Sequence, residues 1–164
     1  MSGTDRNVRT LFEAAARRAR DADLSVADLI SMVERLRALG DDASGRELYR
    51  LWTEHNEGNP LIHAVLFNYG VLLSDAGDLP AAREAYERAC AAQPGFLAAR
   101  INLGSVKERL GDRLAAVGEW YAAAQAQIDL TGDTLGWKVA AWKQAGRVLE
   151  SAKCEEASEN ALHK

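Results

Sequence analysis

The chain has 164 residues, of which 48% are hydrophobic and 27% charged, and its net charge is −4 at pH 7. This size and composition indicate a globular domain with a continuous core and exclude a disordered chain. The lysines and arginines are scattered, which disfavours a nucleic acid partner, and no apolar run is long enough to span a membrane. The first residues lack the apolar segment of a signal peptide, so we expect a cytoplasmic protein.

The first predicted element is an amphipathic helix from about residue 7 to residue 20, whose apolar face is formed by Val8, Leu11, Phe12 and Ala15. It precedes a run of helical hairpins that expose an apolar face at each end of the stack. We therefore expect residues 1–24 to form a capping helix at one end.

Two capping boxes are predicted to start the next two helices. Ser25 and Asp28 form the first box, and Gly40 ends the helix that it starts. Ser44 and Glu47 form the second box. Each pair places a serine at the N-cap and an acidic side chain three residues later, where it can reach back to the free N–H of the cap.

The segment from residue 63 to residue 94 contains two apolar-periodic runs on either side of Gly77-Asp78. The same pattern recurs 34 residues later, where its key positions hold Gly104, Ala116, Trp120 and Ala123 in place of Gly70, Ala82, Tyr86 and Ala89. This spacing of small and bulky residues is typical of tetratricopeptide repeats. The small residues lie where two helices approach closely, and the bulky ones fill the space beside them.

We therefore predict an all-α fold of tandem helix-turn-helix tetratricopeptide repeats in a right-handed α-solenoid. The repeat domain covers residues 25–164, with repeats at about 29–62, 63–96, 97–130 and 139–164. The first repeat is degenerate: a step of 34 residues back from the second places Arg35 and Leu36 where Tyr69 and Gly70 stand, and Trp52 where Tyr86 stands. Residues 131–138 interrupt the pattern, and the truncated last repeat suggests a fragment of a longer protein.

No catalytic, metal or cofactor site is predicted. His55 and His63 lie on different predicted elements, and no Cys/His/Asp cluster has the spacing of metal ligands. Cys90 and Cys154 are expected to be reduced, inert thiols. The glycines serve turns and helix contacts and do not form a phosphate-binding loop.

Amide side chains recur at one position of the repeat. Asn68, Asn102 and Gln144 each lie two residues before a glycine on the first helix of a repeat, and Glu34 fills that place in the first one. An amide offers both a donor and an acceptor, so a series of them can hold a peptide backbone without reading its sequence. The alternative is that an exposed helix position merely tolerates these residues, although asparagine is a poor helix former.

The run NPLIHAVLFNYGVLLSDAGD and the segment GRVLE resemble the tetratricopeptide region of bacterial SPINDLY-like proteins, relatives of the O-linked N-acetylglucosamine transferases. The resemblance covers roughly residue 22 to the end of the chain. It implies that Asn68 and Asn102, with Gln144 as a substitute, belong to an asparagine ladder that holds an acceptor polypeptide. It also implies that the catalytic domain is absent from this chain, so the chain itself is not an enzyme.

We therefore predict a module that binds an extended polypeptide in its concave groove, with Phe67, Ile101 and Arg109 beside Asn68 and Asn102. The alternative is a scaffold that forms homo-oligomers through the exposed ends of its solenoid. A clamp for C-terminal carboxylates is disfavoured, because its basic groove residues are replaced here by Phe67, Val71, Ala98 and Asn102.

Overall fold

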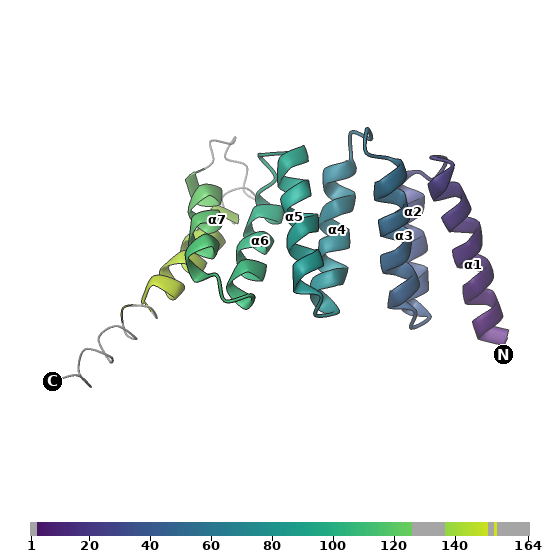
Figure 1. The fold of residues 1–164 in the computed structure, drawn as a ribbon, viewed down its shortest axis with the longest axis horizontal. Coiled ribbons are helices and arrows are strands. Elements are labelled where there is room, and N and C mark those ends of the chain that lie inside the picture. Colours follow the sequence, from purple (N-terminus) through teal and green to yellow (C-terminus); the bar gives the residue numbers. More distant parts are fainter. Residues whose placement is uncertain (1–2, 126–136, 151–152, 154–164) are drawn as a thin grey trace. The chain divides into compact units, whose positions relative to one another are not determined.

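The computed structural model describes residues 3–125, 137–150 and 153, with α1 from Gly3–Arg20 at the N-terminal end (Figure 1). Three helical hairpins follow: α2 (Val26–Ala38) with α3 (Asp42–His55), α4 (Ile62–Asp75) with α5 (Leu79–Ala92), and α6 (Leu97–Arg109) with α7 (Arg113–Gln125). Residues 137–150 form a further helix. This arrangement confirms the all-α fold of tandem hairpins. The chain divides into two compact units, residues 1–92 and residues 93–164.

The turn inside each hairpin is built from the same Gly-Asp pair, as predicted. Gly40, Gly77 and Gly111 have φ of 79°, 82° and 90°, a left-handed conformation that residues with a Cβ rarely adopt. The aspartate that follows each glycine then caps the second helix. Asp41, Asp78 and Asp112 accept hydrogen bonds from the backbone N–H three residues ahead, at 3.0, 3.2 and 3.1 Å.

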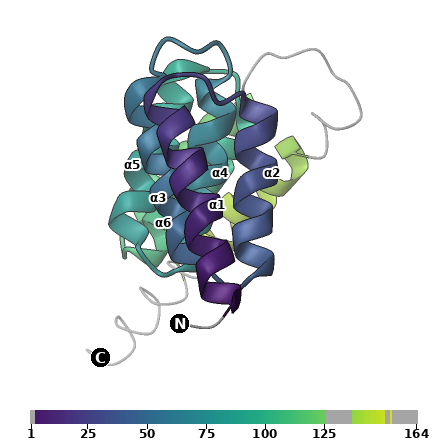
Figure 2. The same ribbon diagram turned by 90° about the vertical axis from the view of Figure 1, so that its right-hand side faces the viewer.

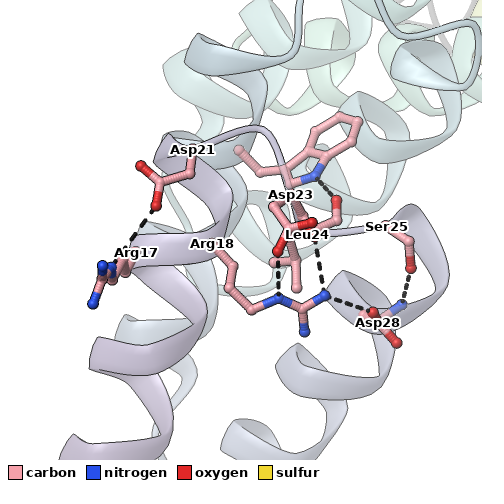
Figure 3. A network of polar contacts seen from close by, with 8 residues as sticks. Arg17, Arg18, Asp21, Asp23, Leu24, Ser25 and Asp28 are labelled. Carbon is pink, nitrogen blue, oxygen red and sulfur yellow. Dashed lines mark hydrogen bonds and ion pairs between the residues drawn. The ribbon is translucent and has the colours of Figure 1, made fainter.

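Helix α1 packs on α3 and α2, and the two views agree on its place beside them (Figures 1 and 2). The buried residues Ala15, Ala16 and Ala19 put its apolar face into the same core cluster as the α2–α3 hairpin. The loop that follows is fastened by Arg18, whose Nη2 donates to Asp28 Oδ2 at 3.1 Å and to the Asp23 carbonyl at 3.0 Å (Figure 3). Helix α1 thus covers one side of the first hairpin.

In the second and third hairpins a glycine lets an aromatic ring lie against the helix backbone. A Cβ added at Gly70 would lie 2.7 Å from the Tyr86 ring, and one at Gly104 would overlap Trp120 Nε1. Trp120 is fully buried and its indole N–H donates to the Ile101 carbonyl at 3.1 Å. Each ring fills the space that the glycine leaves, which is the small-and-bulky pairing predicted from the repeat pattern.

The alignment predicted for the first repeat is wrong by three residues. Gly77 lies 37 positions after Gly40, whereas Gly111 lies 34 positions after Gly77. A step of 37 superimposes the buried residues of α2–α3 on those of α4–α5: Leu29, Val33, Leu36, Gly45, Leu48, Tyr49 and Trp52 on Leu66, Gly70, Leu73, Ala82, Ala85, Tyr86 and Ala89. The three additional residues belong to the connection at 56–61, after the hairpin.

The shifted alignment changes which residues at the helix crossing are large and which are small. Val33 now stands where Gly70 stands in the next hairpin, and Tyr49 stands where Tyr86 stands. The small residue is instead Gly45 on the opposite helix, where an added Cβ would lie 3.2 Å from Val33 Cγ1. Helices α2 and α3 also contact each other less closely than α4 and α5 do.

The two predicted capping boxes are corrected as well. Ser25 does cap α2 by accepting from the Asp28 N–H at 3.1 Å, but the Asp28 carboxylate pairs with Arg18. Helix α3 begins before Ser44, and its cap is Asp41. Glu47 instead accepts from Arg50 at 2.6 and 2.8 Å, a hydrogen bond that lowers the pKa of Glu47.

The last predicted repeat is described only in part. Ala141, Ala145 and Val148 of helix 137–150 are buried against the third hairpin. Trp142 is 49% exposed and meets Tyr121 edge-on at 5.5 Å between ring centroids. Cys154, residues 131–136 and the end of the repeat lie outside the described residues, and Trp137 is 44% exposed. Among the described helices, none is both long and apolar enough to cross a membrane.

Candidate functional site

A shallow pocket lies between the first helices of the first two hairpins, and Asn68 is part of its wall. The side of α2 contributes apolar and charged residues, and α4 contributes Asn68, Val71 and Leu72, with Tyr49 of α3 between them. The residues from α2 are Ile30, Val33, Glu34 and Arg37. A second, smaller pocket continues toward the Gly-Asp turns and shares Arg37 and Leu72 with the first. Together these pockets form the α2–α4 groove.

Asn68 is half-buried, and no hydrogen bond from a described residue reaches its amide. Other asparagines of this unit are used by the fold. Asn56 donates to the carbonyls of Ala19 and Trp52 at 3.2 and 2.9 Å, and Asn59 accepts from the Leu61 N–H at 2.9 Å. The Asn68 side chain therefore keeps its donor and acceptor for water or for a ligand in the groove.

The charged side chains of the groove are partly neutralised by one another. Arg37 Nε lies 3.1 Å from Asp42 Oδ1 in an exposed ion pair. Burial raises the pKa of the neighbouring Tyr49 to about 12; the charge of Glu34 adds to this shift and that of Arg37 opposes it. The Tyr49 hydroxyl thus stays protonated at neutral pH. The groove offers hydrogen-bonding groups of both kinds without a strong net charge.

Glu34 does line the groove beside Asn68, but the shifted alignment removes it from the amide series. A step of 37 residues back from Asn68 reaches Ser31, which is exposed on α2, whereas Glu34 corresponds to Val71. Arg37 and Tyr49 were not predicted as groove residues. The Gly40-Asp41 pair could have indicated them, because aligning the turns rather than the prolines gives the observed register.

Two of the predicted neighbours are committed to packing. Ile101 is only 7% exposed and belongs to the core of residues 93–164 with Trp120 and Ala116. Its side chain is not available to a ligand, so that assignment is corrected. Phe67 is half-buried and its ring lies 6.0 Å from that of Tyr86, inside its own hairpin. Only the outer part of the Phe67 ring can contribute to the α4 surface.

The second unit holds the other predicted amides. Asn102 is half-buried on α6, and Arg109 lies exposed seven residues later, on the same side of that helix. Asn102 and Arg109 both take part in interactions within the protein. Gln144 is half-buried in helix 137–150, and its Oε1 accepts from Arg147 Nε at 3.2 Å.

The described residues contain no group of three or more His, Cys, Asp or Glu side chains that could hold a metal ion. His55 Nδ1 lies 2.9 Å from the Leu51 carbonyl, a contact within its own helix. Cys90 is half-buried on α5.

Two solved structures of similar fold are crystal structures of MamA, a tetratricopeptide-like protein. One is 17% identical in sequence, covers 96% of this chain and 98% of its own, and gives a TM-score of 0.52. The other is 18% identical, covers 93% of this chain and 89% of its own, and also gives 0.52. No protein-family model and no curated protein matches the sequence. The likeness shows a fold of the tetratricopeptide type.

Proposed function

We propose that this chain is a protein-interaction module that binds an extended polypeptide along the first helices of its hairpins. The observation that carries the proposal is the Asn68 amide, which lies half-buried in the α2–α4 groove without a hydrogen bond from any described residue. A polar side chain in such a place gains most from a ligand that supplies both a donor and an acceptor. The backbone of an extended polypeptide supplies both at every residue.

Asn102 and Gln144 are the further contacts, because they hold the same repeat position as Asn68 on α6 and on helix 137–150. Arg109 and the outer part of the Phe67 ring accompany them. Each amide contact contributes about 0.5–1.5 kcal/mol, so two or three contacts give weak binding once the ordering of the peptide is included. We expect a dissociation constant in the micromolar range or weaker.

The resemblance to SPINDLY-like proteins suggests that this module is part of a larger protein. In that reading the chain is the substrate-recognition region of a protein glycosyltransferase, and the bound polypeptide is the acceptor. The similar amide series supports it, and the chain itself carries out no transfer. The proposal would gain most from a sugar-nucleotide-binding domain encoded after residue 164.

A titration of a fluorescein-labelled, unstructured Gly/Ser/Thr-rich peptide tests the binding. The double variant Asn68→Ala, Asn102→Ala should bind about 5- to 160-fold more weakly than the wild type, which corresponds to the loss of two amide contacts. Arg83→Ala, an exposed change on α5, is the matched control and should bind like the wild type. Equal affinities for the double variant and the wild type, with unchanged circular dichroism, would contradict the proposal.

Self-association is the second candidate, and the exposed apolar side chains of helix 137–150 favour it. Val139, Trp142 and Leu149 are 45%, 49% and 50% exposed. Side chains of this kind commonly mark protein contact sites when they gather on one surface. Sedimentation at increasing protein concentration distinguishes the two functions, since Trp142→Glu should abolish oligomers without affecting peptide binding at Asn68.

A further inference from the structure

A chain of three side chains connects α6 to helix 137–150 within the second unit. Arg147 Nη2 donates to both carboxylate oxygens of Glu108, at 2.7 Å each. The Nε–H of the same arginine donates to Gln144 Oε1 at 3.2 Å. A guanidinium holds its donors in one rigid plane, so the position fixed by Glu108 also fixes the direction from which Gln144 is approached.

This contact decides which end of the Gln144 amide remains for a ligand. Its oxygen accepts from Arg147, which holds the NH2 group on the other side, and no described residue accepts a hydrogen bond from that NH2 group. Arginine only donates, so the oxygen of Gln144 must be the atom that faces it. Asn68 has no such neighbour holding its amide, and it can turn either end toward a ligand.

We infer that Arg147, held by Glu108, is a positioning residue that makes Gln144 a hydrogen-bond donor to a backbone carbonyl of the bound polypeptide. The inference rests on the proposed polypeptide-binding function. It assigns different roles to positions that the sequence makes equivalent. The Asn68 position accepts either peptide group, whereas the Gln144 position presents its NH2 group, favours a carbonyl and so restricts the register of the polypeptide.

The contacts of Arg147 act on geometry more than on stability. The Arg147 side chain is 55% exposed and that of Glu108 is 26% exposed. Ion pairs as exposed as this one contribute little to the free energy of folding, because water and salt screen them. Their loss should therefore leave the fold intact while it releases the Gln144 amide.

The first test measures the Gln144 side chain without any ligand. Its NH2 resonances, assigned by comparison with Gln144→Ala, should report an ordered amide in the wild type and a mobile one in Arg147→Met. Arg147→Lys keeps the charge and can still meet Glu108, but it lacks the planar second donor, so it should resemble Arg147→Met. An equally ordered amide in all three proteins would overturn the positioning role.

The second test measures binding of the labelled Gly/Ser/Thr-rich peptide and of versions in which one amide is replaced by an ester. Gln144→Ala and Arg147→Met should each weaken binding about 2- to 13-fold, the effect of one hydrogen bond, and together no more than either alone. An ester weakens the carbonyl acceptor, so one ester position should weaken binding to the wild type but not to Gln144→Ala.

Two results separate the inference from the function beneath it. Additive losses for Gln144→Ala and Arg147→Met, in a protein whose Asn68→Ala variant does bind more weakly, would overturn the inference and leave the proposed function standing. A wild type that binds no peptide would overturn both the proposed function and the carbonyl contact. In that case the amide resonances alone decide whether Arg147 positions Gln144.

Discussion

The α2–α3 and α4–α5 hairpins solve the same packing problem from opposite sides. In α4–α5 the small residue is Gly70 on the first helix, and the ring of Tyr86 from the second helix covers it. In α2–α3 the first helix carries Val33, and the small residue is Gly45 on the second helix. The two hairpins therefore differ in which helix carries the small residue, and the helices of α4–α5 lie in the closer contact.

The two hairpins also differ in what the aromatic side chains of their second helices contact. Tyr49 takes the place of Tyr86, but its ring lies 6.1 Å from that of Tyr69 on the next hairpin, and Val33 occupies the helix crossing. Trp52 takes the place of the small residue Ala89, and its indole N–H donates to the Leu24 carbonyl at 2.7 Å. The first hairpin thus obtains from α1 and its loop part of the packing that the second obtains internally.

The largest loss of stability is expected from substitutions that disrupt the closest helix contact of the second and third hairpins. Gly70→Leu and Gly104→Leu should each lower the free energy of unfolding by at least about 1–3 kcal/mol, because the new side chain meets the Tyr86 or Trp120 ring. Denaturant unfolding followed by circular dichroism measures the change.

The matched variant in the first hairpin is Gly45→Ala. Its new Cβ meets only Val33 Cγ1 at 3.2 Å, and alanine favours a helix interior by about 1 kcal/mol over glycine. We expect a change of less than about 1 kcal/mol. A loss at Gly45 as large as that at Gly70 would show that the two crossings are equally tight, which would contradict the difference between the two hairpins.

A smaller effect is expected from the indole that ties the first hairpin to α1. Trp52→Phe keeps most of the ring but leaves the buried Leu24 carbonyl without its donor, which should cost about 1–3 kcal/mol. Trp142→Phe is the control, since that ring is 49% exposed and should tolerate the change. Thermal unfolding of the two variants side by side makes the measurement. Similar melting temperatures would argue that the bond to Leu24 contributes nothing.

The sequence predicted the fold well where local and repeated signals agree. The Gly-Asp turns at 40, 77 and 111, the apolar face of α1 and the pairing of Gly104 with Trp120 all follow from spacing and residue size. The first repeat was misaligned because Pro60 and Pro94 were matched, although the connection before Pro60 is three residues longer. Three residues are close to one helical turn, so the wrong alignment still placed apolar residues on apolar positions.

The site was predicted less well, for a similar reason. Residue type at a repeat position does not reveal burial, and Ile101 is buried because Trp120 and Ala116 cover it. The residue type also does not reveal which neighbouring group will form a hydrogen bond with a given carboxylate or amide. Ser44 and Glu47 match a capping box in sequence, yet Asp41 reaches the helix N-terminus first. Such choices depend on competition between nearby groups.

The cap of α3 gives the next smaller effect and tests that competition directly. Asp41→Ala removes the acceptor of the Ser44 N–H and should cost about 1 kcal/mol. Ser44→Ala removes only the cap that the sequence pattern suggested, and the free energy of unfolding should change by no more than about 0.5 kcal/mol. Asp78→Ala, the same change in the second hairpin, should match Asp41→Ala. A greater loss for Ser44→Ala than for Asp41→Ala, in denaturant unfolding, would reinstate the capping box.

The smallest effect on stability is expected for Asn68→Ala. An unchanged free energy of unfolding would show that the fold does not depend on this amide. No described residue hydrogen-bonds the Asn68 amide, and alanine is the better helix former by roughly 0.5 kcal/mol, so the variant should be as stable as the wild type or slightly more so. Asn56→Ala is the contrasting change, because it removes the bonds to the Ala19 and Trp52 carbonyls and should cost about 1–2 kcal/mol. A clear loss of stability in Asn68→Ala would mean that the fold itself uses this amide. If stability is unchanged while peptide affinity falls, the poorly helix-forming asparagine at this position is explained by binding, since folding gains nothing from it.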